Sequence, residues 1–484
     1  MSFVRRHWRK PVIACAALIG VLGALHLWVN QRAHLTPPSI TLPQGQPTHP
    51  SATLRRFGDS YALSRGKILE VGLRGTPEQI GYEHARLLYP EMVQNEGILL
   101  GRFQAQVSNP VLRNLLLDLA ELRYAHVDRG MSLARRAEIA AGARGFSPDP
   151  YASVFPTYQR FVYLNALYDM ALSFEHSPLI GCTTFTFGGD VLEGGGGILA
   201  RAFDFEVDEV FDDHKAVFLV REEGRIPFAS VAWPGLVGVV SGMNASGVAV
   251  VVHGARGGTP QAEGEPVVHA LRRVLSTAHN TEEALSALAA QPAMVSHIVI
   301  LTDESGRGAV VERVPGKPNF VRLLAPKAVT TNHFEGPSAE DPKNLTVRAK
   351  TSTLPRRGRG DELLARLPQP LTAPEAVLSA VALLRDHQGE GGKQLALGDR
   401  SAINALIATH GVVMDTKRRV LWVSESPHLL GRFVAFDLNR TFAPDYDPEH
   451  AAELQSIPED PLLTSGAYER YKQSAGPTPK GLKR

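Results

Sequence analysis

Apolar residues are most concentrated near the start of the chain. An apolar run covers residues 11–29, with only His26 interrupting it, and follows the basic segment 1–10, MSFVRRHWRK. A helix of that length rises about 28 Å, close to the ~30 Å hydrocarbon core of a bilayer. The pattern predicts a membrane-anchor helix over 11–29, with the basic tail in the cytoplasm and the remaining chain outside it, as in a periplasm. The alternative is a cleaved signal peptide, which gives a secreted protein.

Behind this run the pattern divides the chain into four further segments. Residues 30–55 are rich in proline and predict an extended linker. Residues 56–181 show mostly helical spacing of apolar positions, and residues 182–443 show short β-branched and aromatic runs cut by glycines. Residues 444–484 form a polar tail that either wraps the surface or is disordered. We therefore expect the chemistry between residues 56 and 443.

Local signals place individual elements within these segments. The sequence Thr76-Pro77-Glu78 is typical of a helix start, with proline in the first turn. Further helices are predicted at 111–125, 158–172, 266–276, 281–290, 361–366 and 374–385. Turns at Met243–Gly247 and Glu304–Gly306 connect apolar runs as hairpin turns do. Hairpin pairs with helix pairs between them predict an α+β fold with largely antiparallel sheets.

Composition excludes several classes of function. Hydrophobic residues make up 44% of the 484 residues, and 51 Lys and Arg against 49 Asp and Glu give a net charge of +2. A globular core is therefore expected, and a strongly basic nucleic-acid binder is not. Two cysteines, Cys15 and Cys182, are too few for a disulfide framework or a Cys-rich zinc site. Gly194–Gly197 lacks the Lys-Ser/Thr of a P-loop and is interpreted as a turn, so neither a metal nor an organic cofactor is expected.

Cys182 is the one cysteine placed where it could act as a nucleophile. It lies in Gly181-Cys182-Thr183, at the change from the helical to the strand pattern. Most free cysteines are small buried hydrophobes, which is the alternative interpretation here. Polar motifs that follow the strand pattern favour chemistry: R-x-x-D at Arg201 and Asp204, and the segment TTNHF that contains Asn332.

These motifs occur in an order that resembles a known enzyme family. They are LRGTPEQIGYEHARLL, GCTTF, ARAFDFE, GMNASGVAV, VVERVPGK, TTNHF, PRRGRGDELL, LRDHQGE and RRVLWVSESP. Together they run from Gly72 to Leu438 and resemble the acyl-coenzyme A:6-aminopenicillanic acid acyltransferase-like family of cysteine Ntn hydrolases, which is related to choloylglycine hydrolase and penicillin V acylase. The resemblance implies a four-layer αββα sandwich. It also implies self-cleavage between Gly181 and Cys182, with the two fragments held together.

The resemblance implies a role for each candidate residue. Cys182 becomes an N-terminal nucleophile, and its own α-amine, with an ordinary pKa of ~7.7–8.0, takes the proton of a thiol whose free pKa is ~8.5. Arg201 and Asp204 flank the new terminus. Asn332 is expected to donate to the oxyanion, with the backbone N–H of His253 or Gly254 as the second donor. Arg356, with Arg357 as the neighbouring candidate, is expected to order the site.

The expected reaction is cleavage of a linear carbon–nitrogen amide in a small molecule through a Cys182 thioester. Water then completes hydrolysis, or an amine acceptor completes acyl transfer. The substrate pocket is expected to use segments 205–215 and 233–240 and part of the chain before Cys182. Two alternatives stay open at this point. One is a phospholipase B-like lipid hydrolase on the same fold, and the other is a membrane-tethered protein without catalysis.

Overall fold

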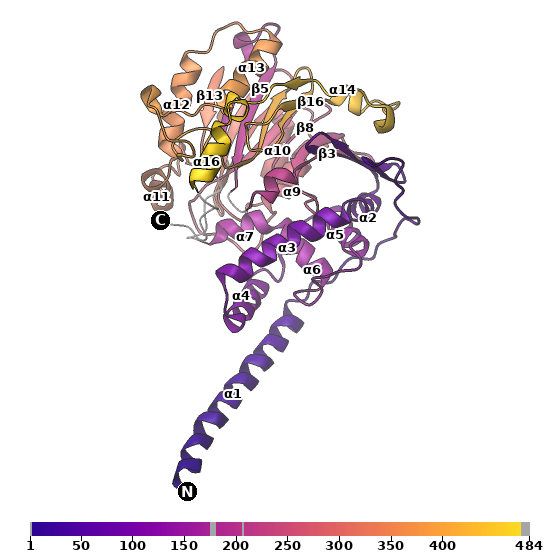
Figure 1. Cartoon of the computed structure of the whole chain (residues 1–484), viewed down its shortest axis with the longest axis vertical. Coiled ribbons are helices and arrows are strands. Elements are labelled where there is room, and N and C mark those ends of the chain that lie inside the picture. The colour runs from indigo at the N-terminus through magenta and orange to yellow at the C-terminus, as the bar shows by residue number, and fades with distance from the viewer. Residues whose placement is uncertain (1, 175–180, 206–207, 476–484) are drawn as a thin grey trace.

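The computed structural model describes residues 2–174, 181–205 and 208–475, which form two stacked sheets with helices around them (Figure 1). The larger sheet has ten strands in the order β1-β2-β3-β6-β7-β8-β9-β10-β11-β12, and among these described strands the one parallel pair is β3 with β6. Its strands are β1 Leu54–Phe57, β2 Ser60–Arg65, β3 Ile68–Gly75, β6 Ala216–Glu222, β7 Phe228–Ala232, β8 Ser241–Asn244, β9 Ala249–Gly254, β10 His297–Thr302, β11 Gly308–Arg313 and β12 Phe320–Leu323.

The smaller sheet has seven strands and is antiparallel throughout. Its order is β13-β4-β5-β14-β15-β16-β17. The strands are β4 Gly181–Gly188, β5 Gly197–Asp204, β13 Lys327–Thr330, β14 Ala408–Asp415, β15 Val420–Ser424, β16 Phe433–Asp437 and β17 Ser456–Ile457. The loop between β4 and β5 holds Gly194, Gly195 and Gly196 at positive φ, as expected for a turn.

Side chains alternate between the two faces of each strand, so each sheet has one face toward the other sheet and one face toward the helices. On β5, Leu199 packs between the sheets, whereas Ile198 and Ala200 face the helices of the smaller sheet. On β6, Val217 packs between the sheets and Phe218 faces outward. Because successive side chains point to opposite faces, a strand that is buried on both sides must be apolar at nearly every position. The α+β class and the antiparallel sheets predicted from the sequence are confirmed.

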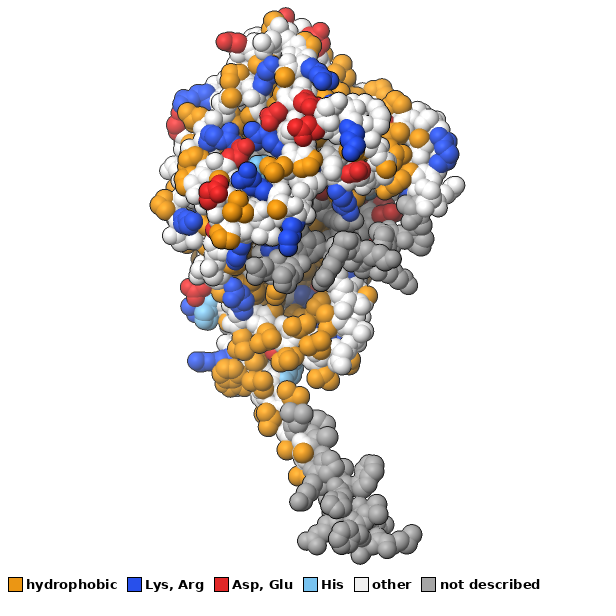
Figure 2. Space-filling view, turned by 90° about the vertical axis from the view of Figure 1, so that its left-hand side faces the viewer, with side chains coloured by type: hydrophobic (Ala, Val, Ile, Leu, Met, Phe, Trp, Pro, Cys, Tyr) orange, Lys and Arg blue, Asp and Glu red, His pale blue; other side chains and the backbone are white. Residues whose placement is uncertain are grey.

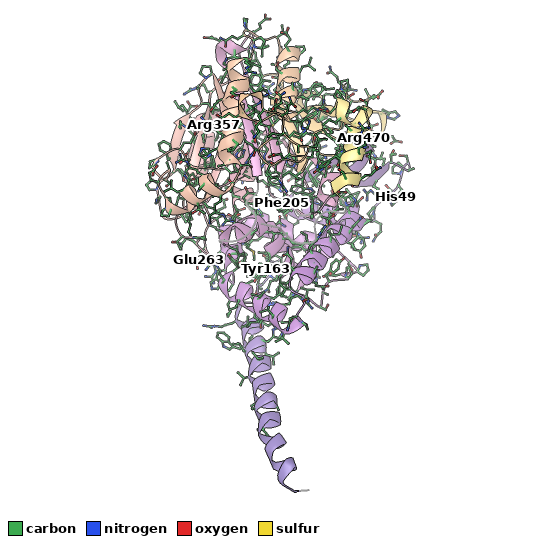
Figure 3. All side chains as sticks on the ribbon, turned by 60° about the vertical axis from the view of Figure 1, so that its left-hand side comes forward. His49, Tyr163, Phe205, Glu263, Arg357 and Arg470 are labelled. Atoms are coloured by element: carbon green, nitrogen blue, oxygen red, sulfur yellow. The ribbon has the colours of Figure 1, made fainter. Side chains whose placement is uncertain are left out.

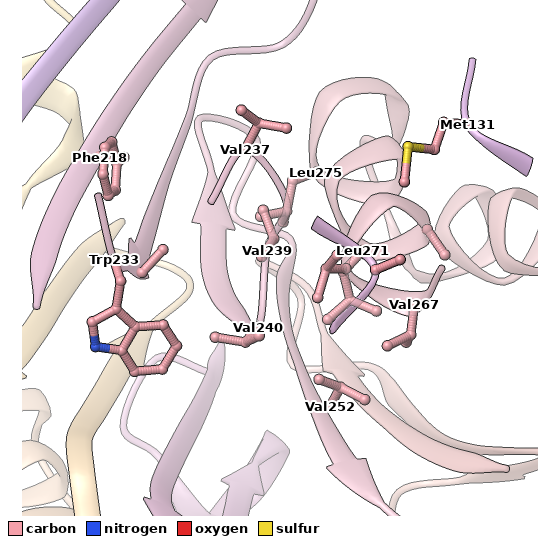
Figure 4. Close-up of a cluster of buried hydrophobic side chains, with 14 of the residues drawn as sticks. Met131, Phe218, Trp233, Val237, Val239, Val240, Val252, Val267, Leu271 and Leu275 are labelled. Atoms are coloured by element: carbon pink, nitrogen blue, oxygen red, sulfur yellow. The ribbon is translucent and has the colours of Figure 1, made fainter. Parts of the chain in front are cut away.

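Two pairs of helices cover the outer faces of the sheets. Helices α9 (Val267–Thr277) and α10 (Thr281–Ala289) pack on the larger sheet, and α12 (Thr353–Ala365) and α13 (Ala373–Leu384) pack on the smaller one. Figure 4 shows part of the core beneath α9, where Leu275 lies next to Val239 and where Val252 of β9 belongs to the same buried cluster. Three of these helices match the predicted ranges, but α12 begins eight residues before the predicted 361.

The segment before Cys182 adds further helices and one unexpected group of strands. Helix α2 (Pro77–Leu87) begins at a Thr76 capping box, as the sequence predicts. The other helices are α3 Tyr89–Gln106, α4 Pro110–Arg123, α5 Leu133–Gly145, α6 Thr157–Asn165 and α7 Leu167–Ser173. The prediction that 56–181 is mostly helical missed β2, β3 and the second half of β1, because these strands are short and β3 pairs with β6, far along the chain.

The predicted membrane-anchor helix is not supported. Residues 11–29 lie within α1 (Ser2–Arg32), and no helix in the described part of the chain is both long and apolar enough to cross a bilayer. The end of α1 instead packs on α4, where His26 Nδ1 lies 2.7 Å from Asp118 Oδ1 and Val29 is buried. A location outside the cytoplasm, which rested on that anchor, therefore stays a prediction.

The C-terminal segment is folded through residue 475. Strand β17 extends the smaller sheet beyond β16, and the short helix α15 (Pro461–Thr464) precedes α16 (Ala467–Ala475). Tyr468 of α16 packs with Leu406 and Leu430, so this segment is held on the surface by a small apolar cluster of its own. Residues 444–475 of the predicted polar tail therefore wrap the surface, and its last nine residues lie outside the described part of the chain.

Candidate active site

Cys182 is the second residue of β4 and lies in the interior of the molecule. It pairs with Phe203 of β5, and Gly181 pairs with Asp204. The thiol is free, and the residue is fully buried. Residues 189–196 connect β4 to β5, and the antiparallel register of the two strands brings the start of β4 against the end of β5.

Arg201 is the cation that contacts the thiol. Its side chain is fully buried, with Nη2 3.3 Å from Cys182 Sγ and 2.7 Å from the carbonyl oxygen of Val252. Nη1 donates to Ser241 Oγ at 2.5 Å. The guanidinium also lies over the Phe203 ring, 4.0 Å from its centroid. These bonds fix the cation beside the sulfur.

Burial and charge act on the thiol in opposite directions. Burial raises the pKa of Cys182, Arg201 opposes that rise, and Asp204 adds to it. The net effect in the uncut chain is a raised pKa, so the thiol is held in its protonated form.

Asn332 and Arg356 approach Cys182 from the other side. Asn332 follows β13, and its Oδ1 accepts from the backbone N–H of Cys182 at 2.7 Å. Arg356 lies on α12 and donates through Nη1 to the Cys182 carbonyl oxygen at 2.5 Å, and through Nη2 to Asn332 Oδ1 at 3.0 Å. The neighbouring candidate, Arg357, is half-buried and pairs with Asp361 instead. Geometry therefore distinguishes the two arginines that the sequence left open.

Asp204, His253 and Gly254 complete the group. A Cβ placed on Gly181 would lie 3.1 Å from Asp204 Oδ2, so this carboxylate adjoins the Gly181–Cys182 peptide. The Gly254 carbonyl oxygen accepts from Asn332 Nδ2 at 2.9 Å. The buried ring of His253 has its Nε2 2.6 Å from Thr184 Oγ1, and burial holds its pKa well below the ordinary value. Apart from the alternative candidate Arg357, the structure brings together the residues predicted for the site.

Two residues that support Arg201, Ser241 and His410, were not predicted from the sequence. His410 of β14 has its Nε2 3.0 Å from Ser241 Oγ and 3.3 Å from Arg201 Nη1. Its ring stacks on the Phe203 ring, with 5.1 Å between the ring centroids. Burial lowers the pKa of His410 well below its ordinary value, and the charge of Arg201 lowers it further. A neutral imidazole next to a guanidinium acts as an acceptor for it. The one available signal was a histidine inside the apolar strand ATHGVVMD.

A cavity opens beside the site. It encloses roughly 960 Å³, including its open mouth, and its walls are mostly apolar. Phe205, Phe211 and residues 233–236 line it, as expected, together with residues from α3, α6 and α7. Figure 3 places Phe205 between the sheets and the helices that precede Cys182. Residues 206–207 of the predicted lining lie outside the described residues.

Phe203 and Val240 connect this cavity to the reacting group. Both line the cavity, and Phe203 is the strand partner of Cys182. Tyr168 of α7 also lines it, and its hydroxyl is buried without a hydrogen-bond partner among the described residues. Through Phe203, this apolar cavity reaches the strand partner of Cys182. In the described part of the chain, no group of three or more His, Cys, Asp or Glu side chains is placed to hold a metal ion.

Comparison with known proteins agrees with this geometry. The model of the family described as acyl-coenzyme A:6-aminopenicillanic acid acyl-transferase matches residues 191–414. Over these residues the match confirms the resemblance that the sequence shows to this acyltransferase family. Arg201, Asp204, His253, Asn332 and Arg356 lie within the matched residues, whereas Gly181 and Cys182 lie outside them.

Individual relatives are more distant. An uncharacterized protein of Archaeoglobus fulgidus is 26% identical over 275 residues, which are 52% of this chain and 44% of that protein. The chain thus spans less than half the length of that relative. Among solved structures, Penicillin V acylase from Agrobacterium tumefaciens is 18% identical with a TM-score of 0.34, over 53% of this chain and 91% of the other.

Two further solved structures are similar at the same level. The N-acylethanolamine-hydrolyzing acid amidase ortholog of Caenorhabditis elegans is 17% identical with a TM-score of 0.32, over 49% of this chain and 93% of the other. A mutant form of the conjugated bile acid hydrolase from Clostridium perfringens is 11% identical with a TM-score of 0.36, over 57% and 97% respectively.

Proposed function

We propose that this Ntn-type enzyme works through Cys182, which it exposes by cutting its own chain between Gly181 and Cys182. The mature enzyme then cleaves a linear carbon–nitrogen amide, or transfers the acyl group of one, through a thioester on Cys182. The observation that carries the proposal is the set of contacts on a single residue. The thiol, the backbone N–H and the carbonyl oxygen of Cys182 each have their own polar partner: Arg201, Asn332 and Arg356.

Self-cleavage needs only the groups that adjoin the scissile peptide. The Cys182 sulfur attacks the Gly181 carbonyl carbon, and the C–N bond breaks as the nitrogen takes up a proton. The resulting thioester between Gly181 and Cys182 is then hydrolysed by water, which leaves a carboxylate on Gly181 and an amine on Cys182. Asp204, which lies next to Gly181, is placed to hold the amine as its charge develops.

The released amine has a chemical use. An α-amine titrates near pH 8, so it accepts the thiol proton at neutral pH and no separate histidine base is needed. Before cleavage the same nitrogen lies 2.7 Å from Asn332 Oδ1, so its position is already fixed. Arg201 at 3.3 Å from the sulfur favours the thiolate that results.

Turnover of a substrate repeats the same bond changes. The thiolate attacks the amide carbon, the amine product leaves with the proton from the α-ammonium group, and the acyl group stays on sulfur. Water or a second amine then releases it. Asn332, with the backbone N–H of His253 or Gly254, is assigned to the oxyanion, and a donor of this kind is worth ~10²–10³ in rate.

The cavity indicates which half of the substrate is bound there. Its lining is mostly apolar and aromatic, and it includes Val240 and Phe203, the strand partner of Cys182. An apolar acyl group gains most from such a space, because its transfer from water is worth roughly 25 cal/mol for each Å² of apolar surface buried. We therefore assign the acyl group, not the amine, to this cavity.

Self-cleavage is tested by the N-termini of the purified protein. Wild type should contain a fragment that begins Cys182-Thr183-Thr184, found by N-terminal sequencing and by intact mass, and Cys182→Ala should remain one chain. Cys15→Ala is the matched control, since it removes the other cysteine and should be processed like wild type. A wild-type chain that stays uncut, with a Cys182 that resists iodoacetamide, would instead identify a non-catalytic protein with a buried thiol.

Turnover is tested on processed protein with N-acyl amides that share one amine and differ in the acyl chain. Release of the amine should increase as the apolar chain lengthens and then stop increasing when the cavity is full. Pre-treatment with iodoacetamide should abolish it. Equal rates for acetyl and long-chain amides would contradict the assignment of the acyl group to the cavity, while leaving the role of Cys182 intact.

A further inference from the structure

Helix α4 has an amphipathic pattern that is inverted for a protein surface in water. The only buried residues on it are its two acidic ones, Asp118 and Glu121. Six large aliphatic side chains are exposed on it instead: Val111, Leu112, Leu115, Leu116, Leu119 and Leu122, with exposed fractions from 37% to 62%. A helix on a water-facing surface normally has the opposite arrangement.

The two acids are turned inward by specific partners. Asp118 Oδ1 lies 2.7 Å from His26 Nδ1 of α1, and Glu121 Oε1 accepts from Gln159 Nε2 of α6 at 2.7 Å. These contacts fix the rotation of α4 about its axis. The leucines therefore face outward because polar contacts of the fold hold them there, and the exposed face is a constant feature of the surface.

The apolar surface continues onto α1. Val21, Leu25, Leu27 and Trp28 are exposed there, and α1 packs on α4. Figure 2 shows hydrophobic side chains gathered at the end of the body from which α1 projects. Soluble monomers rarely expose an apolar surface of this extent without a partner for it.

The chemistry of this surface indicates the partner. The six α4 side chains are all aliphatic, whereas the core of a protein–protein interface is enriched in aromatic residues, Met and Arg. The accessible charge on α4 itself is basic, because its two acids are buried whereas Arg113 is partly exposed and Arg123 is exposed. Aliphatic side chains next to basic ones fit the acyl chains and anionic headgroups of a phospholipid leaflet.

We propose that α4 docks on a phospholipid bilayer, lying in the plane of one leaflet with Leu112, Leu115 and Leu119 among the acyl chains. The docking is peripheral and needs no helix that crosses the membrane. It is independent of the proposed catalytic chemistry, since none of the α4 side chains lines the cavity or contacts Cys182.

The test places a tryptophan on the proposed face in the full chain. Leu119→Trp is mixed with vesicles of phosphatidylcholine and phosphatidylglycerol whose acyl chains are brominated, and wild-type emission is subtracted to remove the native tryptophans. The added emission should lose at least half of its intensity relative to unbrominated vesicles. Leu378→Trp is the matched control, because Leu378 is also an exposed leucine, 52% exposed, but lies on α13, and its emission should not change. An added emission that is not quenched in Leu119→Trp would overturn the proposal.

A second measurement separates lipid from a second copy of the chain. Leu115→Gln with Leu119→Gln should reduce vesicle binding in sedimentation several-fold relative to Leu323→Gln with Leu378→Gln, which changes two exposed leucines elsewhere. Sedimentation velocity without lipid should give the same mass for both variants and for wild type. A wild-type dimer that becomes a monomer only in the α4 variant would overturn the proposal and assign this face to an interface between copies.

Discussion

Arg201 is the residue whose charge acts most directly on the Cys182 thiol. Because burial raises the thiol pKa and Arg201 opposes that rise, replacing Arg201 with Met should raise the pKa further. The rising limb of kcat/KM against pH should move to higher pH, and kcat/KM at pH 7 should fall about tenfold for each pKa unit. Arg201→Lys, which keeps the charge, should shift the limb less. A limb that stays in place in Arg201→Met would contradict the role of Arg201 in thiolate formation.

His269 provides a test of how burial affects stability. It lies on α9 and is almost fully buried, with neither ring nitrogen hydrogen-bonded within the described residues. The pKa of His269 is lowered from 6.5 to about 3, mainly by burial and to a smaller extent by the charges of Arg135 and Arg272. The unfolded chain therefore binds a proton below pH 6.5 that the folded chain does not. The stability that neutral His269 provides is present above that pH and is lost as the pH falls toward 3.

The expected result is a difference between wild type and His269→Leu that depends on pH. Between pH 6.5 and 4.5, wild type should lose about 2 kcal/mol more free energy of unfolding than the variant, as measured by urea titration at each pH. His49→Leu, at an exposed histidine, is the control and should run parallel to wild type. Parallel curves for His269→Leu and wild type would show that this ring is protonated in the folded chain.

At the scale of the element, the position of α12 determines where Arg356 lies. Gly360 faces the smaller sheet, and a Cβ added there would lie 2.7 Å from Val329 Cγ2 and 3.2 Å from Phe185 Cε1. Val is stiff and cannot move aside, so Gly360→Ala should destabilise the fold by roughly 1–3 kcal/mol and shift Arg356 away from Cys182. Reduced self-cleavage and a lower urea midpoint should appear together.

Gly358 of the same helix is the matched control for that prediction. An added Cβ there would meet the end of the flexible, exposed Glu390 side chain, which can turn away. Alanine favours helix over glycine by about 1 kcal/mol, so Gly358→Ala should be neutral or slightly stabilising. If both substitutions reduced stability, the loss at Gly360 could not be attributed to the close packing of α12 on β13 and β4, because any substitution in α12 would have the same effect.

The elements that could be predicted from the sequence are those with local signals. The capping box at Thr76 marks the start of α2, and the resemblance carried by GCTTF and ARAFDFE predicted that Asp204 adjoins Cys182. The start of α12 was misplaced because Pro355, Gly358 and Gly360 are poor helix formers, and only contacts with the sheet stabilise a helix there.

Site residues from distant strands could not be predicted. His410 comes from β14, about two hundred residues after β5, and no local pattern specifies that these strands pair or in which register. Ser241 reaches Arg201 from the other sheet, so its role depends on how the sheets stack. The orientation of α4, with its leucines outward, could not be predicted either, because contacts with His26 and Gln159 on other helices determine it.

For the whole molecule, the fold explains why cleavage would not separate the fragments. Strand β3, from the part before Cys182, pairs in parallel with β6, so the first fragment supplies three strands of the larger sheet. Wild type that has been cut should therefore elute as one particle holding both fragments in equal amounts, and strong denaturant should be needed to separate them. Two separate peaks in native buffer would contradict this prediction.

A buried charge network joins the same two fragments and makes their association depend on pH. Glu222 of β6 contacts Arg135 of α5 at 2.5 Å and Arg272 of α9 at 3.2 Å, and Arg272 contacts Glu138 of α5 at 2.8 Å. Burial raises the pKa of Glu222, but the two arginines outweigh it and hold that pKa below its ordinary 4.5. Its contribution is therefore present above pH 4.5 and is lost as the pH falls through the lower, folded value.

Removing this carboxylate should loosen the cut protein at neutral pH. Breaking a buried ion pair by deleting one partner destabilises by about 3–5 kcal/mol, so Glu222→Gln should release the fragments at lower urea in size-exclusion runs at pH 7. The wild-type release point should fall toward that of the variant as the pH drops below 4.5. Glu335→Gln is the control, since Glu335 pairs with Arg322 and Arg357 near the surface and within one fragment, where ion pairs contribute ~0–1 kcal/mol. If Glu222→Gln released the fragments no earlier than Glu335→Gln, the sheet pairing alone would hold them together.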